Sequence, residues 1–114
     1  MSARIERINS LIKRELATIL HQQINDKRIG FITILRVSVT KDLAHARIYY
    51  SQIGDEQQKK DTKKGLQSAT GFIHTELCYA IPDLKKMPRL HFEYDNSLEK
   101  AVNLVNKINQ LKNE

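Results

Sequence analysis

A cluster of four lysines gives this sequence its clearest chemistry, which is the binding of anions. Its members are Lys59, Lys60, Lys63 and Lys64. Lysines four residues apart on a helix destabilise it by roughly 0.2–0.5 kcal/mol per pair, and Asp61 offsets only part of this repulsion. The surplus of positive charge indicates an anionic ligand, of which RNA phosphate is the obvious one. The alternative is a solvated helix face without a ligand.

Three arginines form a second group with the same chemistry. Arg4, Arg7 and Arg14 fall on one side of a predicted N-terminal helix, roughly opposite its apolar residues. We consider them candidates for phosphate contacts, because a row of arginines on one helix face can follow an RNA backbone. An ordinary solvated helix face explains the same pattern.

A third candidate surface lies on predicted strands. Arg36, Arg47 and Tyr49 are expected on the side of the sheet that faces away from the core, together with His45 and His91. Such side chains can stack on bases or hydrogen-bond to them. Alternatively, the final helix covers part of this surface, or these are plain exposed strand residues. From this group we assign Arg47 to RNA binding.

The sequence contains no motif of a catalytic or metal site. It has no Gly-x-Ser-x-Gly, no glycine-rich phosphate loop and no zinc-hydrolase motif. His74 and Cys78 lie four residues apart, but no second pair has a spacing that would complete a metal site. We therefore expect Cys78 to be a small buried hydrophobic residue and His74 to lie on the polar surface. The sequence predicts a binding protein without a cofactor, a metal or a small-molecule substrate.

Composition agrees with a nucleic-acid-binding protein. The chain has 114 residues, a net charge of +6 and a pI of about 9.6, with 40% hydrophobic residues. We predict a single domain over residues 1–114, with a core over about 2–96 and a C-terminal helix over about 97–112. One cysteine excludes an internal disulfide, and no run approaches the about 20 apolar residues of a membrane span. We expect a cytoplasmic protein that is monomeric when free.

The periodicity of apolar residues predicts an α+β fold. A helix runs from about residue 2 to 24, and the segment 25–30 forms a turn. Strands follow over about 35–40 and 44–51, with Leu35, Val37 and Val39 on the buried side of the first. A helical segment covers about 56–80, a third strand covers 90–95, and a last helix follows. We expect the first two strands to pair antiparallel and the helical crossover to make the third parallel to the second. Helices then cover one face of the sheet.

The helical segment 56–80 contains an interior glycine, Gly71. Glycine costs about 1 kcal/mol relative to alanine inside a helix, and it allows a bend or a close approach of another backbone. We predict two short helices that meet at a kink near Ala69 and Gly71, although Gly65 is a second possible position for the bend. A strand, a bent helix pair and a strand form the central unit of a KH-type RNA-binding domain. A straight helix that tolerates its glycines is the alternative.

Five segments of the chain form a set when they are considered together. They are Arg14-Glu15-Leu16, Asp26-Lys27-Arg28-Ile29-Gly30, Val39-Thr40-Lys41-Asp42-Leu43-Ala44-His45-Ala46, Leu66-Gln67-Ser68-Ala69-Thr70-Gly71-Phe72-Ile73 and Leu90-His91-Phe92-Glu93-Tyr94-Asp95-Asn96-Ser97. In this order and at these separations they resemble the ribosome-binding factor A family. The resemblance covers nearly the whole length of the chain, from Arg4 to about Ser97.

The resemblance implies a fold and a function. The fold is KH-like, in the type II order α-β-β-α-α-β, with Ala69-Thr70-Gly71 as an Ala-x-Gly kink in place of the Gly-x-x-Gly loop. The function is non-catalytic binding to the immature 30S subunit near the 5′ region of its 16S rRNA. It includes help with late rRNA processing and with cold adaptation, and release before translation. The chain departs from the family at Lys27, where proline is frequent, and at His74, where arginine is frequent.

Two other functions remain open at this stage. A KH-like module can act mainly through protein partners, and a small enzyme can have a dispersed active site, although the sequence nominates no substrate. Binding dominated by phosphates depends steeply on salt, whereas apolar protein contacts depend on it weakly. Salt dependence therefore distinguishes the first two functions.

Overall fold

Apolar residues at spacings of three and four explain the first helix. In the computed structural model, which describes residues 2–24 and 26–112, α1 spans Ala3–Gln22. Ile12, Leu16 and Ile19 are at most 3% exposed and face the sheet side of the helix. Each such side chain contributes roughly 1.5–3 kcal/mol when fully buried. The helix ends two residues before the predicted position, and Asn25 of the predicted turn lies outside the described residues.

Three strands form one sheet in the order β1-β2-β3. β1 (Ile32–Val39) pairs antiparallel with β2 (His45–Gln52), and β2 pairs parallel with β3 (Arg89–Tyr94). Both pairings confirm the prediction. Alternate residues of β2 are buried, among them Ala46, Ile48 and Tyr50, so their neighbours face the other side.

The first strand follows its prediction only after a bulge, because Val37 and Val39 are buried as predicted and Leu35 is not. It begins at Ile32, and the register shifts between Ile34 and Arg36. Such a bulge inserts one extra residue and reverses the alternation of side chains. Ile32 and Ile34 are therefore buried before the bulge and Val37 after it, while Leu35 is only partly buried. A simple period of two cannot predict this change.

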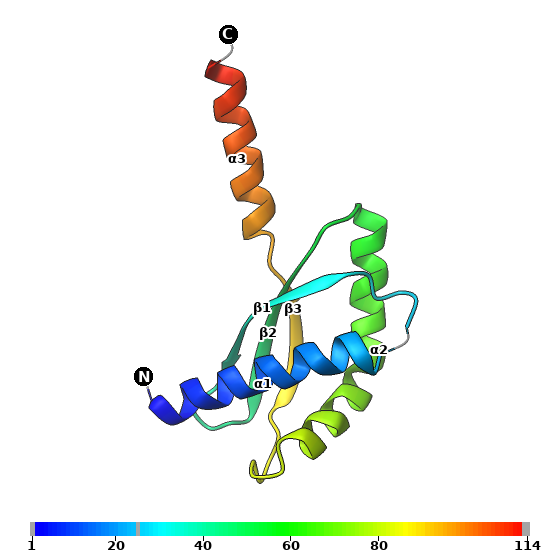
Figure 1. Ribbon diagram of the computed structural model, residues 1–114, viewed down its shortest axis with the longest axis vertical. Helices are drawn as coiled ribbons and strands as arrows, with labels where there is room; N and C mark the ends of the chain where they lie inside the picture. The colour runs from blue at the N-terminus through cyan, green and yellow to red at the C-terminus, as the bar shows by residue number, and fades with distance from the viewer. Residues whose placement is uncertain (1, 25, 113–114) are drawn as a thin grey trace.

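One long helix, α2 (Glu56–Ala80), connects β2 to β3. Asp55 and Gln58 form a capping box at its start, with Asp55 accepting from the Gln58 N–H and Gln58 accepting from the Asp55 N–H, both at 2.8 Å. Figure 1 shows that α2 changes direction about half-way along its length. The predicted order of elements is confirmed, with the two predicted helices joined as one continuous, bent helix.

The helices α1 and α2 cover one face of the sheet, and α3 (Ser97–Lys112) covers neither face (Figure 1). α3 projects from the end of β3 away from the body, and Val102, Leu104, Val105 and Ile108 are between 45% and 60% exposed. The sheet face opposite α1 and α2 is therefore not covered by the last helix. Among the described residues, no helix combines the length and the apolar character that crossing a membrane requires.

Candidate nucleic-acid interface

The first half of α2 presents three of the four predicted lysines to solvent. Lys60, Lys63 and Lys64 are exposed. Lys60 and Lys63 border a hollow of about 310 Å³ between α2, the end of β3 and the start of α3. The cap at Asp55 fixes where the helix begins, and therefore which way these side chains project. We call Lys60, Lys63 and Lys64 the lysine row.

Lys59 differs from the lysine row, because its charge is already paired inside the protein. Its side chain is 15% exposed and forms an ion pair with Glu99 of α3. The Nζ atom also lies 3.6 Å from Oε1 of Glu56 and 5.2 Å from the centre of the Tyr94 ring. Lys59 therefore does not project into solvent as the other three lysines do, and its assignment to RNA binding stays a prediction. Lys59 is better described as the residue that attaches α3 to α2.

The contacts among Lys59, Tyr94 and Glu99 shift the pKa values of these three side chains. The hydrogen bond to Glu99 raises the pKa of Lys59. The hydrogen bond from Lys59, and a second from Tyr94, lower the pKa of Glu99 below its ordinary value of 4.5. Burial raises the pKa of Tyr94. Lys59 and Glu99 are therefore both charged near neutral pH, and an RNA phosphate would have to displace Glu99 to reach Lys59.

The arginines of α1 lie in two separate places. Arg4 and Arg7 border a small apolar hollow of about 170 Å³ near Ile81 and Asp83, at the beginning of the helix. Arg14 is 73% exposed, and its only ion-pair partner among the described residues is the adjacent Glu15, at 3.5 Å. Exposed pairs of this kind contribute little to stability. All three guanidinium groups are available to a ligand, but they do not form one site with the lysine row.

The uncovered face of the sheet brings together residues from all three strands, and we call it the open sheet face. Its residues are Arg36, Ser38, His45, Arg47, Tyr49, Arg89, His91 and Glu93. The guanidinium carbon of Arg36 lies 4.1 Å from the centre of the Tyr49 ring. Nδ1 of His45 lies 2.9 Å from Nε2 of His91. Arg47, the predicted RNA contact, is exposed and is the register partner of His91.

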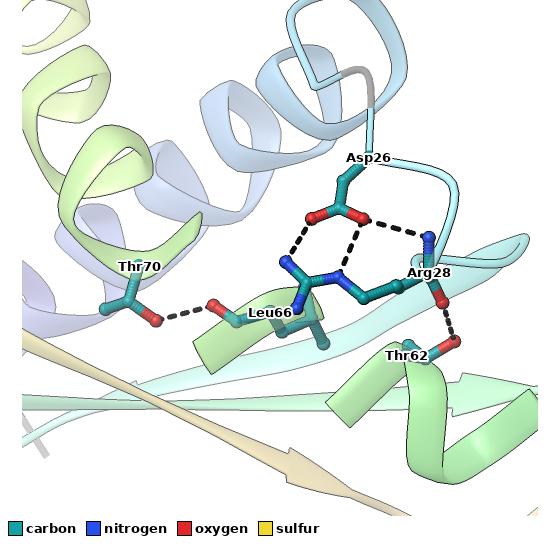
Figure 2. Close-up of polar contacts among 5 residues, drawn as sticks. All are labelled: Asp26, Arg28, Thr62, Leu66 and Thr70. Carbon is teal, nitrogen blue, oxygen red and sulfur yellow. Dashed lines mark hydrogen bonds and ion pairs between the residues drawn. The ribbon is translucent and has the colours of Figure 1, made fainter. Parts of the chain in front are cut away.

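The turn before β1 is held against α2 by polar contacts that the sequence analysis did not identify (Figure 2). Asp26 accepts two hydrogen bonds from the Arg28 guanidinium, at 2.7 and 3.1 Å, and one from its backbone N–H. The buried Thr62 hydroxyl donates to the Arg28 carbonyl and accepts from the Gly30 N–H at 3.1 Å. Arg28 is therefore neutralised locally and positions the turn.

Gly65 is the glycine at which another backbone approaches α2. A Cβ atom there would lie 2.6 Å from Cγ1 of Ile29 and 3.2 Å from Cβ of Arg28. At Gly71 a Cβ atom would meet nothing within 4 Å, and this residue is exposed. A close approach, one of the two roles considered for Gly71, thus belongs to Gly65. The signal was present in the sequence, since Gly65 was a second candidate for the bend.

The bend of α2 coincides with a threonine that bonds back along the helix. The hydroxyl of Thr70 donates to the Leu66 carbonyl at 2.7 Å (Figure 2), and the hydroxyl of Thr75 donates to the Gly71 carbonyl at 3.1 Å. Side-chain bonds of this type often bend helices. Among the described residues no glycine has a positive φ, so Gly71 does not bend α2 through a left-handed conformation.

The burial of His74 and Cys78 differs from what the sequence predicted. Cys78 is exposed, so the expectation of a buried thiol is wrong. His74 is partly buried, and its Nε2 lies 3.3 Å from the Met87 carbonyl. The helix turns Leu77 into the core, which leaves its neighbour Cys78 on the outside. Within residues 2–24 and 26–112, no group of three or more His, Cys, Asp and Glu side chains is arranged to hold a metal ion.

Comparison with known proteins identifies the family of this chain. A family model described as ribosome-binding factor A matches residues 4–108. The chain belongs to the ribosome-binding factor A family. A ribosome-binding factor A from Thioalkalivibrio sulfidiphilus is 42% identical over 102 residues, which are 90% of this chain and 78% of the relative. The family that the five sequence segments suggested is thereby confirmed.

Solved structures of the ribosome-binding factor A family have the same fold. A Thermotoga maritima protein, determined by NMR in solution, is 30% identical with a TM-score of 0.72, and the match covers 85% of this chain and 92% of that one. A homology model of the Thermus thermophilus ribosome binding factor A, fitted into a cryo-EM map of a 30S–RbfA complex, is 23% identical with a TM-score of 0.66. That match covers 84% of this chain and 97% of the other and shows a common fold.

Proposed function

We propose that this protein is a non-catalytic assembly factor that binds the small ribosomal subunit through 16S rRNA. Membership in the ribosome-binding factor A family is the observation that carries this proposal. The 30S complex into which a family member of the same fold was fitted supports it. The net charge of +6 agrees with an RNA partner. We further propose binding near the 5′ region of the rRNA, late in processing, as a cytoplasmic monomer that aids growth in the cold.

The mechanism that we propose is positioning by phosphate contacts. The lysine row is the principal contact, because its three charges are exposed, adjacent and held by one rigid helix. Arg4, Arg7, Arg14 and Arg47 are proposed as secondary contacts. Lys59 acts indirectly in this scheme, since its pair with Glu99 sets the direction in which α3 leaves the body. A folded domain that holds charges at fixed positions can stabilise one conformation of an assembly intermediate without any chemical step.

Sedimentation with small subunits at a series of salt concentrations tests this function. Each neutralised phosphate contributes roughly −0.7 to −0.9 to the slope of log affinity against log salt. Three contacts from the lysine row therefore predict a slope of about −2 or steeper. Subunits purified before and after maturation serve as the two ligands, and we expect tighter binding to the immature ones. Affinity that stays constant with salt would contradict binding through phosphates.

A module that acts mainly through protein contacts is the second candidate, and one observation favours it. Val102, Leu104, Val105 and Ile108 of α3 are exposed although they are apolar. Apolar side chains in such a group are typical of a surface that another protein covers. This candidate predicts a shallow salt dependence and a loss of subunit binding when Val105 and Ile108 are changed to serine. The phosphate mechanism predicts little change for that variant.

A further inference from the structure

We infer that the open sheet face binds a single-stranded segment of RNA by stacking and by phosphate contacts. The inference rests on the proposed function and adds a second surface to the lysine row. Both helices that pack on the sheet lie on its other face, and α3 leaves the body without covering this one (Figure 1). The face is therefore accessible across all three strands.

The charge of the open sheet face favours a polyanion. Arg36, Arg47 and Arg89 are exposed on it, one from each strand, and Glu93 is the acidic residue among its strand positions. Charged and polar side chains dominate this face, in contrast to the opposite face, which holds the core. Leu35 at the bulge of β1 is an aliphatic strand residue that does not pack on the core cluster. The face therefore offers little apolar area to a protein partner, whereas its guanidinium groups can bind the phosphates of a nucleic acid.

The same face carries flat groups on which bases can stack. The Arg36 guanidinium lies over the Tyr49 ring at 4.1 Å, and Arg36 is exposed. The rings of His45 and His91 have their centres 5.1 Å apart and share a hydrogen bond of 2.9 Å between ring nitrogens. Guanidinium planes, tyrosine and histidine rings are the groups on which proteins stack the splayed bases of single-stranded RNA.

The strand register sets these groups in alternating order. Along β2, His45, Arg47 and Tyr49 follow one another in two-residue steps of roughly 6.5–7 Å. Arg47 stands between His91 on β3 and Ser38 on β1, and Tyr49 has Arg36 beside it on β1. An RNA strand that runs along β2 thus meets an imidazole, a guanidinium and a phenol in turn. Groups for base stacking and a group for phosphate binding therefore alternate along β2.

Binding of a fluorescein-labelled ten-residue oligouridylate to the full chain tests the inference. The variant Tyr49→Thr/His91→Ala removes two stacking groups without removing an arginine. Loss of an aromatic stacking partner weakens single-strand binding by roughly fivefold to a hundredfold per base, so we expect a loss of at least about tenfold. The control Tyr79→Thr/His21→Ala makes the same changes at exposed positions outside this face and should bind as wild type. Arg36→Lys keeps the charge but loses the planar group, and should also weaken binding.

The NMR signals of the His45 and His91 rings give a second readout that does not depend on a substitution. We expect both to shift on addition of the oligouridylate, while the signal of His21 stays in place. Equal losses for the Tyr49/His91 variant and its control, or shifts confined to the lysine row, would overturn the inference. If the protein sediments with small subunits but does not bind the oligomer, only the open sheet face is excluded. Failure of both assays for the wild type contradicts the proposed function as well.

Discussion

Gly65 and Gly71 both lie inside α2, yet they have different surroundings. The turn before β1 packs against Gly65, with Ile29 and Arg28 where a Cβ atom would be. Space around Gly71 is open, although this glycine lies in the Ala-x-Gly segment that resembles the family motif. The first half of α2 is thus fixed by contacts with another segment, and at Gly71 no neighbouring segment requires glycine. The comparison shows that a glycine in a family motif need not be the one that packing requires.

Gly71→Pro should have the largest effect in α2. Proline removes a backbone donor from the interior of the helix and its ring clashes with the preceding turn, at a cost of about 3 kcal/mol or more. Because Ile73 and Leu77 follow immediately in the core, we expect the second half of the helix to lose its packing. Urea denaturation measures the loss of stability. A variant as stable as wild type would show that α2 is already broken at this position.

Gly65→Ala should destabilise the protein less than this, but clearly. Overpacking against Ile29 costs roughly 1–3 kcal/mol, and the better helix propensity of alanine returns part of it. We therefore expect a net loss of up to about 2 kcal/mol in urea denaturation. The control repeats the change in an Ile29→Ala background. Alanine lacks the Cγ1 atom that the new Cβ would meet, so Gly65→Ala/Ile29→Ala should lose less stability relative to Ile29→Ala than Gly65→Ala loses relative to wild type.

Gly71→Ala should have the opposite sign. Since no glycine of the described residues has a positive φ and nothing lies near the added methyl group, alanine should stabilise the protein by about 1 kcal/mol. The same variant tests whether the kink of α2 is needed for binding, because alanine favours a straighter helix. Reduced binding to small subunits together with raised stability would mark the kink as functional. Equal destabilisation by alanine at 65 and at 71 would refute the comparison between the two glycines.

The ion pair between Lys59 and Glu99 should give a small, pH-dependent effect. The folded state lowers the pKa of Glu99 below 4.5, mainly through the hydrogen bond from Lys59. The ionised Glu99 carboxylate therefore stabilises the folded state above pH 4.5. This stabilisation is lost as the pH falls through the lowered pKa that Glu99 has in the folded state. We expect Glu99→Gln to melt below wild type at pH 6, and the difference to shrink at pH 3. A constant difference would exclude titration of this pair.

Much of the fold was predictable from the sequence because the apolar periods are regular. The helical spacing of Ile12, Leu16 and Ile19 and the alternation of Ala46, Ile48 and Tyr50 agree with the buried sides of α1 and β2. The bulge after Ile34 was not predicted, because Leu35 is apolar and continues the alternation of Val37 and Val39 backwards along the chain, which hides the change of phase. The continuity of α2 was missed for a similar reason, because a bent helix and two helices have the same apolar pattern.

The candidate site was predictable only as a set of charges. Local sequence shows that Lys59 and Lys63 have like charge, but it does not show that Glu99, forty residues away, pairs with Lys59. The partners of Arg28 and of Gly65 are also set by tertiary packing. Which charges remain free for a ligand therefore depends on contacts that no spacing rule contains.

The central claim is that the lysine row binds the small subunit, and reversal of its charge tests this most directly. The variant Lys60→Glu/Lys63→Glu/Lys64→Glu is compared with Lys41→Glu/Lys85→Glu/Lys86→Glu, which makes the same charge change at three exposed lysines elsewhere. A thermal melt verifies that both variants fold. In sedimentation with immature small subunits at one low salt concentration, we expect the first to lose binding and the second to retain most of it. Equal binding by the two variants would contradict the claim.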